Sequence, residues 1–349
     1  MNRLLNTPPH TRWSTSSLSW ALLTLTLSAL SLAPHTLSAR PKAPKALTID
    51  LERAQGKAEG TAGEASGYER PFVWRLSCPA RAPLHLVGTM HVPDDRFKRL
   101  PKVLLEAISE SDAVYGELDL RDKERMSAAI MPHLMLPSGQ QLKERLPAKT
   151  YELLERYLQR KGSSVVMFSS MKPAAVEIML PMLELMPLMA QGLPGLDELI
   201  LKRAQELGKE VGGVETIDEQ LKAMFSNSDK EVVESLTHTL KRLNELLNQG
   251  KSAHDDLFQA FFSGDEKQIE ATIADELKDA PPSQVKTMRR LLNKRNEVMA
   301  ERILRYTKDH PKRRYLFAFG VAHFIGKESV TNALVSAGCK ATRLLSTAH

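Results

Sequence analysis

The chain has 349 residues, of which 42% are hydrophobic and 26% charged, a composition typical of a globular protein with a sizeable core. Its formal net charge is +6, but the basic residues are spread out and form no block of the kind that binds nucleic acid, so we expect no nucleic-acid partner. The two cysteines, Cys78 and Cys339, form no Cys-x-x-Cys zinc motif. They can either pair as a disulfide or remain as two buried thiols.

Residues 1–39 have the pattern of a secretory signal peptide. They carry two arginines and no acidic residue, then an apolar run from about Leu18 to Ala33, and they end in Leu37-Ser38-Ala39, which suits a small-residue cleavage site. The apolar run is too short and too rich in Ser and Thr to span a membrane, and no other stretch is long enough. We expect an exported protein, periplasmic or secreted, whose mature chain does not span a membrane.

Residues 40–70 are rich in Ala, Gly, Lys, Glu and Pro and hold few large apolar side chains, which is typical of a flexible linker. The globular part begins with an alternating stretch, residues 72–76, that predicts a strand and a hairpin with the next one. We expect residues 71–349 to form a single domain.

Two apolar segments, residues 84–91 and 315–323, end in the same Gly-x-x-His pattern. Each predicts a buried strand that stops at the glycine and places a histidine, His91 or His323, at its carboxyl end. Because ligands bind at the carboxyl ends of strands in open α/β sheets, we expect the two histidines to converge on one site. The alternative is that each histidine only satisfies hydrogen bonds of its own turn.

A helix and a strand are expected after the first histidine. Apolar residues in 100–108 recur at helical spacing, and residues 113–119 predict a strand whose alternation places Glu117 and Asp119 on one side. This order is that of a βαβ unit, so Glu117 would lie at the same sheet edge as His91. The alternative is that Glu117 points into solvent.

Residues 121–310 are mostly helical in pattern. Four methionines from Met179 to Met189 lie at helical spacing, and such a stripe is usually core, although methionine also lines grooves that bind peptides. Residues 209–215 predict a short strand that ends in Glu215. We therefore predict an α/β fold with a mixed central sheet, two strand-Gly-x-x-His units, and a large mostly helical segment between them.

The last long helix, roughly residues 283–306, carries Arg295 and Asn296 on or beside its apolar stripe. A buried guanidinium must find a partner, because an unpaired buried charge costs several kcal/mol. Glu117, Glu215 or a bound substrate would supply that partner. The alternative is an arginine that reaches water from the edge of the stripe.

Two imidazoles and a carboxylate at one sheet edge suit a divalent metal ion. We predict His91, Glu117 and His323 as its ligands, and nitrogen and oxygen donors without thiolate fit manganese, cobalt, zinc or iron. Three protein ligands leave positions open for water, which is typical of a catalytic site.

A water bound to such a metal is nucleophilic near neutral pH, which makes hydrolysis of an amide or ester the expected reaction. Glu215 would act as the base, and Arg295 or Asn296 would stabilise the oxyanion. Which of the two glutamates is the ligand and which is the base stays open. The better-known hydrolase and nucleotide-binding motifs are absent from the sequence.

A set of motifs in order along residues 72–345 resembles the TraB/GumN family, and especially its Tiki branch. The motifs are Gly88-Thr89-Met90-His91-Val92-Pro93, Tyr115-Gly116-Glu117-Leu118-Asp119, Leu136-Pro137-Ser138-Gly139, Gly195-Leu196-Asp197, Val214-Glu215 with Glu219-Gln220, Lys294-Arg295-Asn296-Glu297, and Phe317-Ala318-Phe319-Gly320-Val321-Ala322-His323-Phe324-Ile325-Gly326. The ordered set is far more specific than any one motif.

Tiki proteins are metal-dependent proteases that use manganese or cobalt and cut near the amino terminus of secreted Wnt proteins. The resemblance implies a metalloprotease acting on a peptide or protein substrate, with His91, Glu117 and His323 matching the family's histidines and strand-end glutamate. Animal Tiki proteins carry a carboxyl-terminal membrane anchor that this chain lacks, so the resemblance suggests a soluble, bacterial-type relative.

A second function from a different class fits the same family. Some TraB relatives dampen peptide pheromone signals, so the chain could be a non-catalytic protein that sequesters a peptide or another ligand. Such a protein would use the methionine stripe as a groove and would not need an open metal site. Metal content and metal-dependent cleavage of peptides separate the two functions.

Overall fold

The computed structural model describes residues 68–345, except residues 122 and 193. The predicted signal peptide and nearly all of the predicted linker lie outside the described residues. Tyr68, near the end of that predicted linker, is buried and packs against the rings of Phe97 and Phe261. The packed part of the chain therefore begins before residue 71.

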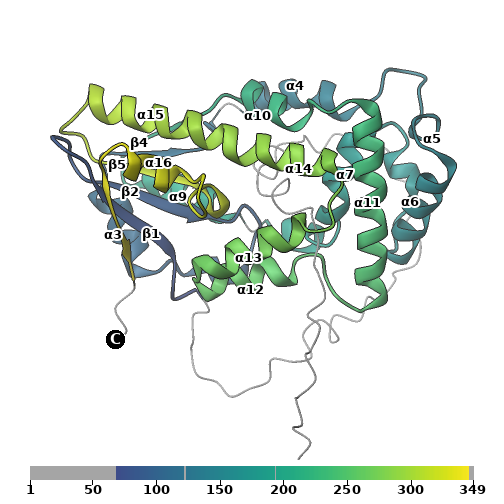
Figure 1. Ribbon diagram of the computed structural model, residues 1–349, viewed down its shortest axis with the longest axis horizontal. Coiled ribbons are helices and arrows are strands. Elements are labelled where there is room, and N and C mark those ends of the chain that lie inside the picture. Colours follow the sequence, from purple (N-terminus) through teal and green to yellow (C-terminus); the bar gives the residue numbers. More distant parts are fainter. Residues whose placement is uncertain (1–67, 122, 193, 346–349) are drawn as a thin grey trace, which may run out of the picture.

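The predicted mixed sheet is present and has six strands in the order β4-β3-β5-β2-β1-β6 (Figure 1). β4, β3, β5 and β2 run parallel to one another, whereas β1 pairs antiparallel with β2 and with β6. The expected hairpin and βαβ unit are confirmed, and β5 lies between the two strands of that unit. The strands are β1 (Phe72–Ser77), β2 (Leu84–Thr89), β3 (Ala113–Gly116), β4 (Glu210–Gly213), β5 (Tyr315–Gly320) and β6 (Lys340–Leu344).

The helices fall into those that cover the sheet and those that pack beside it (Figure 1). α9 and α15 cover opposite faces, because Gly116 faces Leu201 of α9 while its neighbour Tyr115 packs on Tyr306 of α15. The first group comprises α3 (Lys102–Glu110), α9 (Leu196–Glu206), α15 (Arg295–Asp309) and α16 (Val330–Ser336). The others are α4 (Lys123–Leu134), α5 (Leu142–Arg145), α6 (Ala148–Arg160), α7 (Pro173–Met182), α8 (Met186–Ala190), α10 (Ile217–Met224), α11 (Asp229–Asn248), α12 (Asp255–Ser263), α13 (Glu266–Leu277) and α14 (Pro282–Arg289).

Two boundaries differ from the sequence-based prediction. β3 ends at Gly116, so strand alternation does not extend to Asp119, which instead pairs with Arg121 near the surface. The last long helix is interrupted by a π-helical turn, residues 290–294, between α14 and α15. Such turns change the direction of the side chains that follow and are frequent at functional sites. Here the residue that follows is Arg295.

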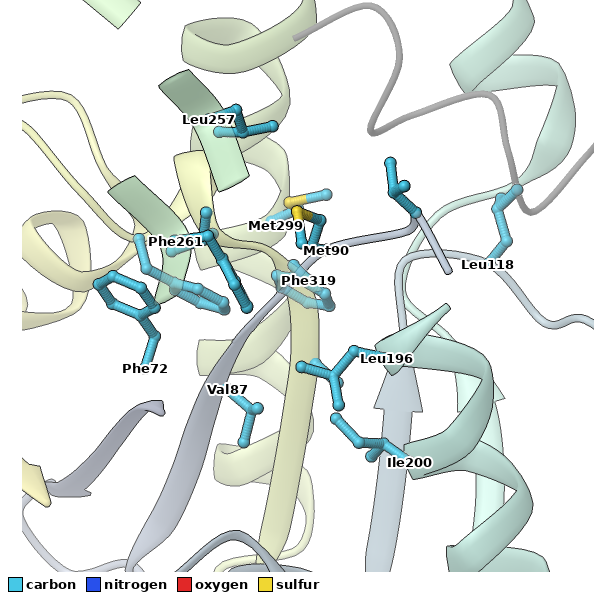
Figure 2. Close-up of a cluster of buried hydrophobic side chains, with 14 of the residues drawn as sticks. Phe72, Val87, Met90, Leu118, Leu196, Ile200, Leu257, Phe261, Met299 and Phe319 are labelled. Atoms are coloured by element: carbon cyan, nitrogen blue, oxygen red, sulfur yellow. The ribbon is translucent and has the colours of Figure 1, made fainter. Parts of the chain in front are cut away.

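The core lies between the sheet and its helices. Figure 2 shows how side chains from distant elements meet there, among them Val87 of β2, Phe319 of β5 and Ile200 of α9. All three are fully buried. Because the central strands are buried on both faces, their sequences are continuous apolar runs rather than alternating ones.

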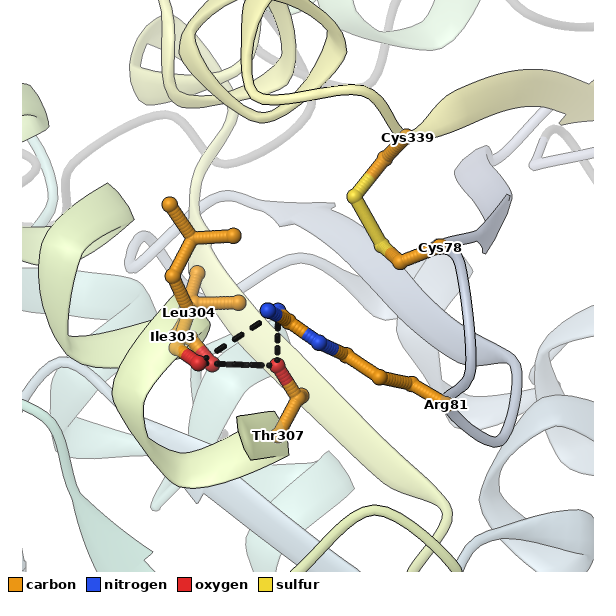
Figure 3. Close-up of a disulfide and its surroundings, with 6 residues drawn as sticks. All are labelled: Cys78, Arg81, Ile303, Leu304, Thr307 and Cys339. Carbon is orange, nitrogen blue, oxygen red and sulfur yellow. Dashed lines mark hydrogen bonds between the residues drawn. A yellow bond between two sulfur atoms is a disulfide. The ribbon is translucent and has the colours of Figure 1, made fainter. Parts of the chain in front are cut away.

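A disulfide between Cys78 and Cys339 links β1 to the edge strand β6 (Figure 3). Cys78 follows β1 and Cys339 precedes β6, so the bond joins the ends of two paired strands. Beside it, Arg81 of the hairpin loop donates hydrogen bonds to the carbonyl of Leu304 and the hydroxyl of Thr307 on α15. Of the two states predicted for the cysteines, the structure has the disulfide and not two buried thiols.

The methionine stripe is mostly part of the core. Met182 is buried, Met179 and Met189 pack partly buried against the core, and Met186 is exposed. This packing matches the core interpretation of the stripe. Among the described helices, none is both long and apolar enough to cross a membrane.

Candidate metal and catalytic site

The predicted site residues converge at the carboxyl ends of four neighbouring parallel strands. In sheet order, Glu215 follows β4, Glu117 follows β3, His323 follows β5 and His91 follows β2. Each of these side chains is nearly inaccessible to solvent. The expectation that the two histidines meet at one sheet edge is therefore confirmed in the structure.

Glu117 lies between the two histidines. Its Oε1 atom is 3.4 Å from Nε2 of His91 and 3.7 Å from Nε2 of His323. The same oxygen accepts a hydrogen bond of 2.8 Å from the N–H of Gly320, at the end of β5. Two ligands of one tetrahedral metal ion, each about 2.1 Å from it, stand about 3.4 Å apart, so this spacing is of the size that shared coordination requires.

Each histidine is oriented by a partner on its other ring nitrogen. Nδ1 of His91 is 3.0 Å from a carboxylate oxygen of Asp197, at the start of α9. Nδ1 of His323 is 2.6 Å from Oδ1 of Asn296, and the amide nitrogen of Asn296 donates to the carbonyl of Glu328. Because Oδ1 only accepts, Nδ1 of His323 carries the proton and Nε2 presents its lone pair to the site.

The loop before α9 brings Asp197 close to His91. The N–H of Leu196 donates to the carbonyl of Met90, which joins this loop to the end of β2. At Gly195, a Cβ atom would come within 2.6 Å of the carbonyl oxygen of His91, so only glycine allows this approach.

Arg295 provides the positive charge of the cluster. Its Nη2 atom donates to Glu117 at 2.6 Å and to Glu215 at 2.5 Å, and its Nε atom donates to Glu215 at 3.0 Å. Nη1 donates to the carbonyl of Leu291. Gln220 of α10 also donates to both carboxylates, at 3.2 and 3.3 Å. The predicted carboxylate partners of Arg295 are thus both present, and the arginine does not reach toward water.

The two histidines have opposite pKa shifts. Burial lowers the pKa of His91, but the carboxylates of Asp197 and Glu117 outweigh it and raise that pKa to about 10. Burial lowers the pKa of His323 to about 3, because Glu117 opposes it only in part. His91 is therefore protonated near neutral pH when it binds no metal, and His323 is neutral.

The two glutamates also differ. Burial would raise the pKa of Glu117, but the nearby Arg295 holds that pKa well below its usual range. At Glu215 burial dominates over Arg295, and the pKa is raised. Two carboxylates whose pKa values are moved apart are suited to different roles, one permanently ionised and one able to take up a proton.

The donor chemistry fits a divalent metal ion. Nε2 of His91 and Nε2 of His323 are buried and face the same Glu117 oxygen, at distances longer than an ordinary hydrogen bond. Yet in the part of the chain that the structure describes, no three His, Cys, Asp or Glu side chains are already spaced to hold a metal. Both Glu117 oxygens accept hydrogen bonds, one from Gly320 and the other from Arg295 and Gln220.

A small pocket opens onto this cluster. It has a volume of about 10 Å³, room for one water molecule, and its walls include His91, Glu117, Asp197 and Gln220. Asp197 and Gln220 were not assigned a role from the sequence. Both stand in motifs that carry the family resemblance, Gly195-Leu196-Asp197 and Glu219-Gln220, but the periodicity of α9 and α10 does not show what either side chain contacts.

The comparisons with known proteins agree with the resemblance. A sequence model of the TraB/PrgY/gumN family matches residues 72–343. "Metalloprotease TIKI homolog" of Nematostella vectensis is 28% identical over 312 residues, which cover 76% of this chain and 65% of that protein. "Metalloprotease TIKI1" of Homo sapiens is 27% identical over 361 residues, covering 90% of this chain and 67% of that protein.

A bacterial protein of unassigned function also matches. "Uncharacterized protein YbaP" of Escherichia coli is 25% identical over 166 residues, which cover 47% of this chain and 61% of that protein. The chain thus spans less than two thirds of the length of the sea-anemone and bacterial relatives. No solved structure matches the chain.

Proposed function

This chain belongs to the TraB/PrgY/gumN family, and from that premise we propose that it is a metal-dependent peptidase that hydrolyses peptide bonds of a peptide or protein substrate. The observation that carries the proposal is the pair of buried Nε2 atoms, on His91 and His323, that face one oxygen of Glu117 at 3.4 and 3.7 Å. Relatives that match most of the chain are named metalloproteases, which supports the same reaction class.

His91, Glu117 and His323 would hold the metal. Manganese or cobalt is favoured by the resemblance to Tiki proteins, and zinc or iron would suit the same nitrogen and oxygen donors. When bound, such an ion lowers the pKa of a water molecule and polarises a carbonyl group. Asp197 and Asn296 hold the two imidazoles in the orientation that directs Nε2 into the site.

Glu215 is the carboxylate best suited to move a proton. Burial raises its pKa above the ordinary range of a glutamate, which is the direction that suits a group that takes up and returns a proton. Arg295 and Gln220 keep that carboxylate in place beside Glu117. Of the five N–H donors of Arg295, only one hydrogen on Nη1 is left beyond the bonds described. Both polar atoms of the Asn296 side chain are also engaged. This arrangement favours positioning roles for both residues over donation to an oxyanion.

We also propose that the protein is exported. The amino-terminal pattern of residues 1–39 supports this proposal, and so does the disulfide between Cys78 and Cys339, because disulfides persist mainly in oxidising compartments. Locating a tagged full-length chain by cell fractionation tests it. Recovery in the cytoplasm with the sequence of residues 1–39 still attached would contradict it.

The test of the peptidase is metal-dependent cleavage of a peptide library by the purified protein. We expect cleavage with manganese or cobalt and none after EDTA treatment. His91→Ala and His323→Ala should each abolish both cleavage and metal binding while the protein stays folded, although His91→Ala should also lower the melting temperature because Asp197 and Glu117 lose the cation between them. The matched control is His310→Ala, at an exposed histidine outside the site. A wild-type protein that binds peptides but cleaves none with any divalent metal would refute the peptidase in favour of a sequestering protein.

A further inference from the structure

β4 is an edge strand of the sheet, and the chain leads from its carboxyl end directly into the candidate site. On the inner side, the N–H groups of Glu210 and Val214 donate to carbonyls at the two ends of β3. Because backbone groups alternate in direction along a strand, the N–H and C=O of Val211 and Gly213 point away from β3. Within the described residues, no other strand pairs with this outer side.

A pocket of about 280 Å³ lies along the same edge, between β4 and α9. Its apolar walls include Leu120, Leu201 and Val211. At its rim, Asp119 and Arg121 pair with each other at 2.5 Å, and both side chains are largely exposed. The three apolar side chains suit an apolar group of a ligand. The charged residues of the lining, which also include Glu198 and Lys202 of α9, are of both signs and do not select one charge.

This edge pocket lies next to the small pocket of the candidate site. Leu120 and Leu201 line both the edge pocket and the small pocket that contains His91 and Glu117. A ligand lying in the edge pocket would therefore contact leucines that also line the pocket of Glu117.

We propose that the outer edge of β4 and the edge pocket together dock an extended segment of the substrate, as an added strand with one apolar side chain in the pocket. This inference rests on the proposed peptidase function. Strand addition would bind the main chain of any extended peptide through Val211 and Gly213, and the pocket would provide preference among side chains.

The dimensions allow a docked segment to reach the site. Neighbouring strands lie about 4.8 Å apart, so an added strand beside β4 would be two spacings, about 10 Å, from the end of β3 and Glu117. An extended chain covers about 3.3 Å per residue, so the bond to be cut would lie about three residues beyond the docked segment.

Val211→Pro tests the docking. Proline removes the outward N–H of Val211 and leaves the inward bonds of β4 in place. For eight-residue unstructured peptides with a central leucine, we expect KM to rise about tenfold while kcat and the melting temperature stay near the wild-type values, because one intermolecular hydrogen bond and the close approach of the strand are lost.

Val211→Ala is the matched control, since it keeps the N–H but shortens the pocket wall. It should weaken the preference for leucine over aspartate at the central position of the peptide, and raise KM less than Val211→Pro does. An unchanged KM in folded Val211→Pro would overturn the docking while the peptidase function stands.

Hydrogen exchange gives a second readout that does not require turnover. With the inactive His323→Ala variant and the leucine peptide, the amides of Val211 and Gly213 should become protected, because a docked strand accepts hydrogen bonds from the edge. Cleavage by the wild type without this protection would overturn the inference. Protection without any cleavage by the wild type would support the docking and refute the peptidase.

Discussion

Arg295 and Glu215 form a buried pair in which Nε and Nη2 of the guanidinium both donate to the carboxylate, at 3.0 and 2.5 Å. The same Nη2 also donates to Glu117 at 2.6 Å, so one side chain holds together two carboxylates that follow different strands. Two buried carboxylates without this cation would repel each other and lose solvation. The arginine thus keeps the acidic part of the site in its folded arrangement.

We predict that Arg295→Lys lowers the free energy of unfolding by about 1.5 to 3 kcal/mol, because an ammonium cannot give the planar, two-atom donation that Glu215 receives. Metal content should also fall, since Glu117 would lose its anchor. Urea unfolding, metal content and turnover are to be measured on one preparation.

The same variant tests the oxyanion role predicted from the sequence. If Arg295 stabilises the oxyanion, turnover should drop roughly a hundredfold to a thousandfold with full metal and unchanged stability. Full activity together with unchanged stability would contradict both roles.

The protonated state of His91 leads to a second prediction, on metal binding. The carboxylates of Asp197 and Glu117 outweigh burial and raise its pKa to about 10, so at pH 7 the ring must release a proton before Nε2 can bind a metal. Apparent metal affinity should therefore rise with pH, about tenfold per unit below that pKa. Calorimetry in two buffers with different ionisation enthalpies should detect the released proton.

Asp197→Asn provides the control for this linkage. Removing the carboxylate charge lowers the pKa of His91, so fewer protons should be released at pH 7. Equal proton release by the wild type and by Asp197→Asn would show that the proton comes from another group, such as water.

The main features of this site could be predicted from the sequence because they follow from strand ends. Buried parallel strands have continuous apolar sequences, and residues after their carboxyl ends meet at one edge, which placed His91, His323 and Glu117 together. The apolar stripe of the last helix likewise showed that Arg295 needed a buried partner.

Other features depend on tertiary contacts that periodicity does not record. The insertion of β5 between β2 and β3 comes from pairing across about two hundred residues of sequence. The role of Asp197 depends on a single close backbone approach at Gly195. Residues 290–294 contain no proline or glycine that would mark the π-helical turn before Arg295. Each is visible only once the elements are packed.

A third prediction concerns Glu177, which is buried among the helices beside the sheet. Its Oε1 atom accepts hydrogen bonds from Ser235, Thr239 and Gln284, but burial outweighs these bonds and raises its pKa to about 7. In the unfolded chain the carboxyl group of Glu177 ionises near the ordinary pKa of a glutamate. Between that pKa and pH 7, the folded state therefore binds more protons than the unfolded state. Stability should therefore decrease as pH rises across this window.

Glu177→Gln removes the ionisation and keeps the shape. We expect it to be more stable than the wild type at pH 8, by up to about 3 kcal/mol, and to differ little at pH 4. Urea unfolding at the two pH values measures the difference. A gain of the same size at both pH values would mean that the charge of Glu177 is not its cause.

The fourth prediction concerns the disulfide. Cys78 and Cys339 are 261 residues apart in sequence, so their bond restricts a very long loop of the unfolded chain. Replacing both by serine should lower the free energy of unfolding by about 2 to 5 kcal/mol. Reducing the wild type with dithiothreitol should reproduce the loss. If the oxidised, reduced and serine forms unfold at the same urea concentration, the bond does not stabilise the fold.

The last prediction separates two roles of Asn296. Oδ1 of Asn296 accepts from Nδ1 of His323, and its amide nitrogen donates to the carbonyl of Glu328, so the side chain fixes the histidine from the far side of the site. If this positioning is its role, Asn296→Ala should weaken metal affinity about tenfold to a hundredfold, while kcat at saturating metal stays near normal.

Asn296→Asp sharpens the distinction, because it keeps an acceptor for Nδ1 of His323 but loses the donor to Glu328. Positioning through the histidine requires the acceptor, so this variant should retain more metal affinity than Asn296→Ala. If Asn296 instead donates to the oxyanion, both variants should lose about a hundredfold or more in kcat even when fully loaded with metal. Calorimetric metal affinity and kcat at saturating metal therefore give opposite patterns for the two roles, and a loss confined to kcat would overturn the positioning role.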